Sequence, residues 1–194
     1  MSFVPNLITL GRLILVPVII YLIGHQEFEA AFWVFVAAGV SDGVDGFIAR
    51  RFNVKTTLGA WLDPVADKAL LVSIFVSLGM QDLIPNWLVI LVVSRDVLIV
   101  GAVQISWLIG FSITMRPLMV SKINTTVQIA YAAGVLAVLG FGLEASLASA
   151  LVLGTYLTGM TTVVSGASYL VDWVRDVSAW ETDEAEKQHT ASDN

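Results

Sequence analysis

The residues best suited to chemistry are four aspartates that flank a short basic segment in the N-terminal part of the chain. Asp42 and Asp45 are three positions apart, and Asp63 and Asp67 are four positions apart. On α-helices these separations place both members of each pair on one face. Carboxylates beside apolar spans are costly and repel one another unless a cation neutralises them. We therefore predict that the four side chains meet at one cation site.

Hard divalent ions fit this set of ligands best. Oxygen donors without any cysteine favour Mg²⁺ or Mn²⁺. Two such ions, about 3.5–4 Å apart, could clamp the oxygens of a phosphoryl group during its displacement. The alternative is a solvated interfacial face whose acids pair with Arg50, Arg51, Lys55 and Lys68. Four acids in phase with two glycines on two helices argue against that alternative.

The two glycines favour a nucleotide ligand. Gly46 and Gly59 share faces with the acids, where a missing side chain lets a pyrophosphate approach the backbone. Arg50 follows Gly46 by one turn and is placed to contact phosphate. The complete pattern reads Asp42-x2-Asp45-Gly46-x2-Ala49-Arg50-x8-Gly59-x3-Asp63-x3-Asp67.

This pattern resembles the signature of the CDP-alcohol phosphotransferase family at all eight fixed positions, and the start PNLITLGR is also similar to that family. The resemblance implies that Asp42, Asp45 and Asp63 bind the metals. It implies that Asp67 completes the metal site and is the base that takes the acceptor's hydroxyl proton. It also implies that the CDP moiety is held by Gly46, Ala49, Arg50 and Gly59.

The composition places these residues in a membrane protein. Hydrophobic residues make up 57% of the 194 and charged residues 13%, with a mean hydropathy of +0.82. A soluble domain of this size could not bury so much apolar surface. Apolar stretches of about 20 residues predict six transmembrane helices at residues 6–23, 31–48, 60–79, 87–109, 123–140 and 147–170. We predict an all-α fold with one membrane domain, residues 1–175, and an acidic, disordered tail, residues 176–194.

Basic residues predict the orientation. They lie beside the second and fourth connections and the C-terminal end, at Arg50, Arg51, Lys55, Arg116, Lys122 and Arg175. The positive-inside rule places these connections and both termini in the cytoplasm. The chain start lacks the pattern of a cleaved signal peptide, so we expect the first helix to be retained. We expect an integral protein of the bacterial inner membrane, with its active site toward the cytoplasm and no nucleic-acid partner.

The remaining intramembrane polar residues are candidates for binding the acceptor. Arg95 adjoins Asp96, and the two could form an ion pair that joins helices. Alternatively, Arg95, Arg116 and Lys122 could bind an acceptor phosphate. Neighbouring polar side chains could line the same cavity or hydrogen-bond between helices: Ser121, Asn124, Thr125 and Gln128.

Within the family, the segments LIPNWLVILVVSRDVLIVGA, PLMVSKINTTVQ and TTVVSGASYLVDW are most similar to CDP-alcohol-type cardiolipin synthases. This resemblance implies a homodimer that transfers the phosphatidyl group of CDP-diacylglycerol to phosphatidylglycerol and releases CMP. The alternative is a phosphatidylglycerophosphate synthase, whose acceptor is glycerol 3-phosphate; periodicity and spacing do not decide between them. The phospholipase D type of cardiolipin synthase is excluded, because it needs paired His-x-Lys motifs and the only histidines are His25 and His189.

Two other classes of function fit the pattern less well. A transporter would place ionisable groups at several depths of the bundle, whereas these acids gather at one side of the membrane. A purely structural membrane protein leaves Gly46 and Gly59 unexplained.

Overall fold

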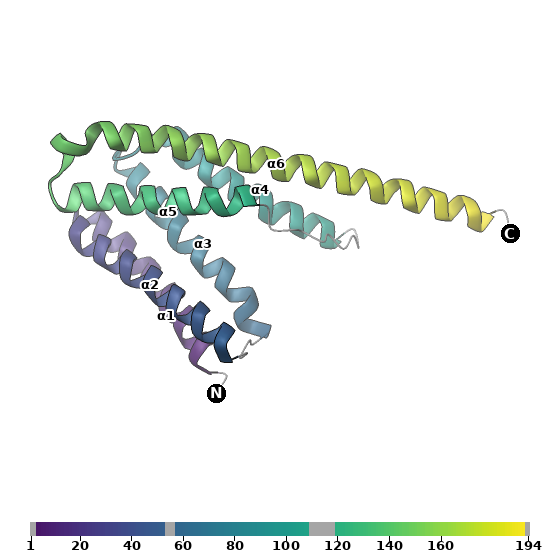
Figure 1. Cartoon of the computed structure of the whole chain (residues 1–194), viewed down its shortest axis with the longest axis horizontal. Coiled ribbons are helices and arrows are strands. Elements are labelled where there is room, and N and C mark those ends of the chain that lie inside the picture. The colour runs from purple at the N-terminus through teal and green to yellow at the C-terminus, as the bar shows by residue number, and fades with distance from the viewer. Residues whose placement is uncertain (1–2, 53–56, 109–118, 193–194) are drawn as a thin grey trace. The chain divides into compact units, whose positions relative to one another are not determined.

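The computed structural model describes the backbone of residues 3–52, 57–108 and 119–192, and the side chains of residues 11, 13–41, 68–102 and 119–178. These ranges form α-helices and contain no β-strand, which confirms the all-α prediction. In chain order the helices of Figure 1 are α1 (Phe3–Gly24), α2 (Phe28–Phe52), α3 (Thr57–Met80), α4 (Asn86–Leu108), α5 (Met119–Gly140) and α6 (Glu144–Ser192).

Helix length is compatible with membrane crossing. Helices α1 to α5 contain 22 to 25 residues each, which is about 33–37 Å at the rise of an α-helix. Over the described residues, Met119–Gly140 and Glu144–Ser178 are long and apolar enough to cross a membrane. Leu13–Gly24, Phe28–Ser41 and Lys68–Met80 are shorter apolar stretches. The two qualifying helices support a membrane protein, while six crossings and cytoplasmic termini stay predictions.

The same backbone turn ends α1, α3 and α5. Residues with positive φ close each of these helices: Gln26 at 62°, Asp82 at 57° and Gly142 at 64°. The next amide then donates to a carbonyl five positions earlier: Glu27 to Leu22, Leu83 to Leu78 and Leu143 to Val138, at 2.9, 3.0 and 2.9 Å. This is the bonding of a Schellman motif, which satisfies carbonyls left over at a helix end. It allows the following helix to start within a few residues.

The chain forms two compact units, and the first comprises Met1–Val89 and Gln128–Tyr156. In this unit α1 packs against both α2 and α3. Its core is mainly apolar, with Ile23, Ile74 and Phe75 at most 1% exposed. Burial of these side chains supplies the packing that holds the helices bearing the aspartates.

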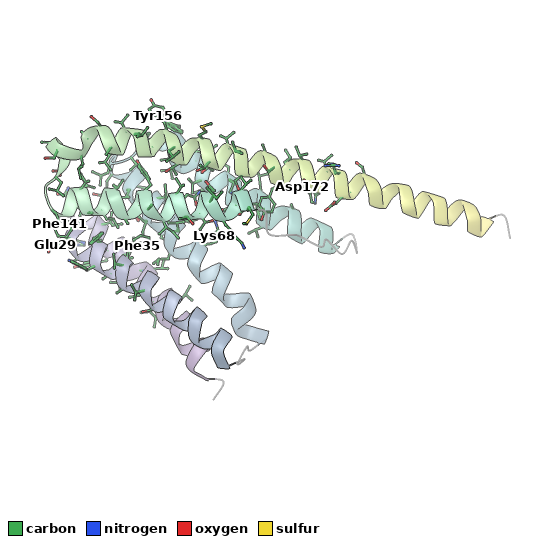
Figure 2. All side chains as sticks on the ribbon, in the orientation of Figure 1. Glu29, Phe35, Lys68, Phe141, Tyr156 and Asp172 are labelled. Carbon is green, nitrogen blue, oxygen red and sulfur yellow. The ribbon has the colours of Figure 1, made fainter. Side chains whose placement is uncertain are left out.

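The end of α5 lies directly against the start of α2 within this unit. A Cβ added to Gly140 would lie 2.7 Å from the Cα of Glu29, so the two backbones approach as closely as glycine permits. The ring of Phe141 packs edge-on against Phe32, with centroids 5.6 Å apart. Figure 2 labels Glu29 and Phe141 at this end of the unit.

The second unit comprises Ile90–Val127 and Leu157–Asn194. Its interior includes several buried polar side chains, among them Arg95, Asn124, Thr162 and Ser165. Buried polar groups need hydrogen-bond partners, particularly where water is excluded. The interior of this unit is therefore organised by hydrogen bonds as well as by apolar packing.

Helix α6 extends beyond the predicted sixth span. It is continuous from Glu144 to Ser192 and includes most of the tail that we predicted to be disordered. Residues 176–192 contain neither glycine nor proline and are rich in alanine, glutamate and other strong helix formers. This composition is compatible with a helix, and disorder of the tail stays a prediction. A domain boundary at residue 175 is not marked by a helix end.

Candidate active site

The predicted metal ligands lie on two successive helices. Asp42 and Asp45 belong to the C-terminal half of α2, and Asp63 and Asp67 to the N-terminal half of α3. Counted from the helix ends that residues 53–56 connect, Asp45 and Asp63 are each about 10 Å along their helices. Asp42 and Asp67 are each about 15 Å along. The helix register therefore gives two pairs of acids at matched depths.

The scaffold brings these two helices to a common end. Figure 1 shows α2 and α3 running in opposite directions, and both pack against α1. Phe52 and Thr57, the residues that face the connection, are five positions apart, a span of at most about 18 Å. The side chains of residues 42–67 lie outside the described residues. The assignment of Asp42, Asp45, Asp63 and Asp67 to a metal site thus stays a prediction.

The residues predicted to hold CDP lie nearer the same helix ends. Arg50 is two residues before the end of α2, and Gly59 is two residues after the start of α3. Each is therefore about 3 Å from its helix end. Gly46 and Ala49 lie on α2 between Asp45 and Arg50. On each helix the predicted nucleotide residues therefore lie nearer the connected end than the acids do.

The donor chemistry of this segment fits hard divalent ions. Four carboxylates could supply oxygen ligands, and the chain has no cysteine thiolate to favour a softer metal. Among the side chains that the structure describes, no group of three or more His, Asp or Glu residues could hold a metal. The described part of the chain therefore offers no competing metal centre.

Arg95 of α4 is held by three helices in the second unit, with 4% of its side chain exposed. Its Nη1 donates to Asp96 Oδ1 at 2.7 Å. Its Nη2 donates to Ser121 Oγ of α5 at 2.6 Å and to Ser165 Oγ of α6 at 2.7 Å, and Nε donates to Ser165 at 3.3 Å. The guanidinium carbon is 5.7 Å from the ring centroid of Tyr169. The ion pair with Asp96 is present but lies within α4, so it does not join helices; the links to α5 and α6 come from Ser121 and Ser165, and a role in acceptor binding stays a prediction.

Asn124 makes a second link between α5 and α6. It has no exposed surface, and its Oδ1 accepts hydrogen bonds from Thr161 at 3.0 Å and from Thr162 at 2.9 Å. Thr125 instead donates to the carbonyl of Ser121 in its own helix, at 3.1 Å. For Asn124, hydrogen bonding between helices is therefore what the structure shows.

The other acceptor candidates are placed differently. Lys122 lies on the exposed side of α5, whereas Ser121 and Asn124 face the interior of the second unit. Arg116 belongs to residues 109–118, which lie outside the described residues. The structure thus brings Arg95 and Ser121 into direct contact, and Asn124 follows Ser121 by one helical turn.

The partners of Arg95 and Asn124 on α6 were not among the predicted site residues. They are Thr161, Thr162, Ser165 and Tyr169. Their positions were detectable in the sequence, because polar residues at separations of three and four in an apolar span mark one helix face. The spacing could not predict that this face contacts Arg95 and Asn124.

An apolar groove of about 280 Å³ lies between α4 and α6 in the second unit. Gly101 lines it from α4, and Gly166, Tyr169 and Trp173 line it from α6. Gly166 and Tyr169 are also in contact with Arg95. These two residues therefore border both Arg95 and the groove.

Comparison with known proteins identifies the family. The model of the CDP-alcohol phosphatidyltransferase family matches residues 2–169. The chain is 35% identical over 185 residues to proteins from Rattus norvegicus and Homo sapiens named cardiolipin synthase (CMP-forming), covering 86% of this chain and 60% of each relative. It is 34% identical over 182 residues to a chloroplastic CDP-diacylglycerol–glycerol-3-phosphate 3-phosphatidyltransferase from Oryza sativa subsp. japonica, covering 85% of this chain and 55% of that protein. The chain thus spans about 55–60% of the length of these relatives. It belongs to the CDP-alcohol phosphatidyltransferase family.

Proposed function

We propose that this chain is a membrane enzyme that transfers the phosphatidyl group of CDP-diacylglycerol to phosphatidylglycerol, forming cardiolipin and releasing CMP. The proposal rests mainly on the two pairs of aspartates, one on α2 and one on α3, which lie at similar distances from the connected helix ends. The chain that carries them is a member of this transferase family. The names of the rat and human relatives support cardiolipin as the product.

In the proposed reaction, a hydroxyl oxygen of phosphatidylglycerol attacks the phosphorus that bears the diacylglycerol. The bond from this phosphorus to the oxygen of CMP breaks, and CMP leaves with the bonding electrons. Asp67 takes the proton of the attacking hydroxyl as general base. Its position on α3, one turn after Asp63, supports this role by placing a carboxylate beside the other acids.

Asp42, Asp45, Asp63 and Asp67 are the residues that would hold Mg²⁺ or Mn²⁺, and we propose two ions. Bound there, the ions would supply positive charge against the negative charge that develops on the pyrophosphate oxygens. The protein's own contribution would be helices α2 and α3, which carry the four carboxylates.

The two substrates would use different residues. Gly46, Ala49, Arg50 and Gly59 would hold the CDP moiety at the end of α2 and the start of α3. Arg95, with Ser121, Asn124, Arg116 and Lys122, would bind the acceptor. Support for this second group comes from the buried guanidinium of Arg95, since a charge inside a membrane protein is costly and usually marks a functional site.

We propose a bacterial inner membrane as the setting, with six crossings, cytoplasmic termini and a homodimer as the working unit. The apolar helices and the family support a membrane location. Membrane lipids then serve as both surroundings and substrates.

A phosphatidylglycerophosphate synthase is the second candidate, because the rice relative is named for glycerol 3-phosphate. Detergent-purified full-length protein should be given labelled CDP-diacylglycerol with either phosphatidylglycerol or glycerol 3-phosphate, and the lipid product identified. We expect cardiolipin and CMP from the first mixture. Phosphatidylglycerophosphate from the second, with no cardiolipin from the first, would establish the second candidate instead. If no CMP is released with either acceptor, both candidate functions are contradicted.

A further inference from the structure

We propose that Ser165 and Tyr169 of α6 are positioning residues that aim the Arg95 guanidinium at the acceptor's phosphate. The inference deepens the proposed function and rests on the acceptor-binding role given there to Arg95. It assigns to α6 a part in acceptor choice, although α6 lies outside the aspartate signature.

Ser165 fixes the plane of the guanidinium. It has no exposed surface, and its Oγ accepts from both Nε and Nη2 of Arg95, at 3.3 and 2.7 Å. Two donors from one edge of a rigid planar group, held by a single oxygen, restrict rotation about the last bonds of the side chain. Ser121 accepts from Nη2 on the α5 side at 2.6 Å.

These bonds, with that from Nη1 to Asp96, use four of the five N–H groups of a guanidinium. The fifth belongs to Nη1, and the rigid fork fixes its direction once the other four are held. That N–H, together with the charge of the group, is what Arg95 can present to a phosphate oxygen. Its aim is therefore set by Ser165 and Ser121.

Tyr169 and Gly166 confine Arg95 from α6. The Tyr169 ring lies 5.7 Å from the guanidinium carbon, within the range of a cation–π contact. A Cβ added at Gly166 would lie 3.5 Å from Arg95 Cγ, so the stem of Arg95 runs directly beside this glycine. The aliphatic part of Arg95 thus lies beside Gly166, and its guanidinium contacts Ser165 and Tyr169. All three residues belong to one short stretch of α6.

The competing explanation is that Arg95 serves only to join helices. In that case, loss of the Ser165 hydroxyl would lower stability and impair the use of both substrates alike. A positioning role instead predicts an effect on the acceptor alone. The two explanations are separable because CDP-diacylglycerol is assigned to α2 and α3 and the acceptor to Arg95.

The experiment measures steady-state kinetics of full-length Ser165→Ala and Tyr169→Leu, varying each substrate separately. We expect the KM for phosphatidylglycerol to rise about 10-fold in Ser165→Ala, as for loss of a hydrogen bond to a charged group, and about 2- to 5-fold in Tyr169→Leu, as for loss of a cation–π contact. The KM for CDP-diacylglycerol should be unchanged in both. Tyr169→Phe keeps the ring and should retain the wild-type KM. Ser168→Ala is the matched control, since the Ser168 hydroxyl donates to the Val164 carbonyl of its own helix, at 2.8 Å.

The same substitutions are then made in the Arg95→Lys background, which keeps the positive charge but lacks the planar guanidinium. If Ser165 acts through Arg95, Ser165→Ala should add little in this background. Full additivity there, an equal loss for both substrates, or the same KM change in Ser168→Ala would overturn the inference. If the wild type uses glycerol 3-phosphate instead, the cardiolipin proposal fails, and the same KM comparison with that acceptor tests the positioning role. Should Arg95→Lys leave the acceptor KM unchanged while cardiolipin is made, the inference fails and the proposed activity stands.

Discussion

Replacing Gly140 with alanine should destabilise the first unit, and the structure indicates by how much. The added Cβ would lie 2.7 Å from both Cα and N of Glu29 and 3.0 Å from the carbonyl carbon of Phe28. All three are backbone atoms, so no side-chain rotation can relieve the overlap. Carbon atoms pack best from about 3.5 Å, so the start of α2 and the end of α5 must separate by roughly 0.8 Å.

Overpacking of this kind costs about 1–3 kcal/mol, and the smaller backbone entropy of alanine returns about 0.5–1 kcal/mol. Taking the middle of each range, the net loss should be about 1 kcal/mol, or roughly 2–4 °C in melting temperature for a chain of this length. Circular dichroism of the detergent-purified protein measures it. Gly134→Ala is the matched control on α5, since its Cβ would meet nothing within 4 Å. The reasoning is refuted if Gly140→Ala melts at the same temperature as Gly134→Ala or above it.

The remaining predictions concern the charged residues. Asparagine at any one of the four signature aspartates should lower transfer at least about 100-fold without preventing purification; retention of more than about a tenth of activity in two of the variants contradicts the site. Mg²⁺ or Mn²⁺ at 100 times its dissociation constant should stabilise the protein by about 2.7 kcal/mol, and an equal shift in Asp63→Asn would place the ion elsewhere. Arg95→Met should lower stability by at least about 1.5 kcal/mol, because it removes the hydrogen bonds to Asp96, Ser121 and Ser165; wild-type stability in unfolding measurements would show that these bonds do not stabilise the protein.

The helices were predictable because apolar runs and turn residues are local signals. The predicted span 123–140 ends where α5 ends, at Gly140, and Gly142 supplies the positive φ that closes the turn. Starts were less well predicted: α2 begins at Phe28 rather than residue 31, because a helix can begin before the apolar run that marks it in the sequence. Helix α6 continues to Ser192, past the end of the apolar run, because hydropathy marks the apolar part of a helix and not its full length.

The contacts of Arg95 could not be predicted in the same way. Its separation from Ser121 is 26 positions and from Ser165 is 70 positions, so no periodicity within one helix relates them. The sequence left an ion pair and a phosphate contact open as alternatives for this residue. The structure adds the hydroxyl partners and the ring of Tyr169, which depend on how α4, α5 and α6 pack within the second unit.

The contrast between local signals and contacts between helices also concerns the choice of acceptor. Relatives named for cardiolipin and for glycerol 3-phosphate are nearly equally similar to this chain, at 35% and 34% identity. Family membership and the aspartate pattern therefore fix the type of transfer without fixing the acceptor. Discrimination between a diester lipid and a small phosphate monoester needs a site that distinguishes their charge and shape. We propose that the residues of α5 and α6 that converge on the Arg95 guanidinium contribute to this discrimination.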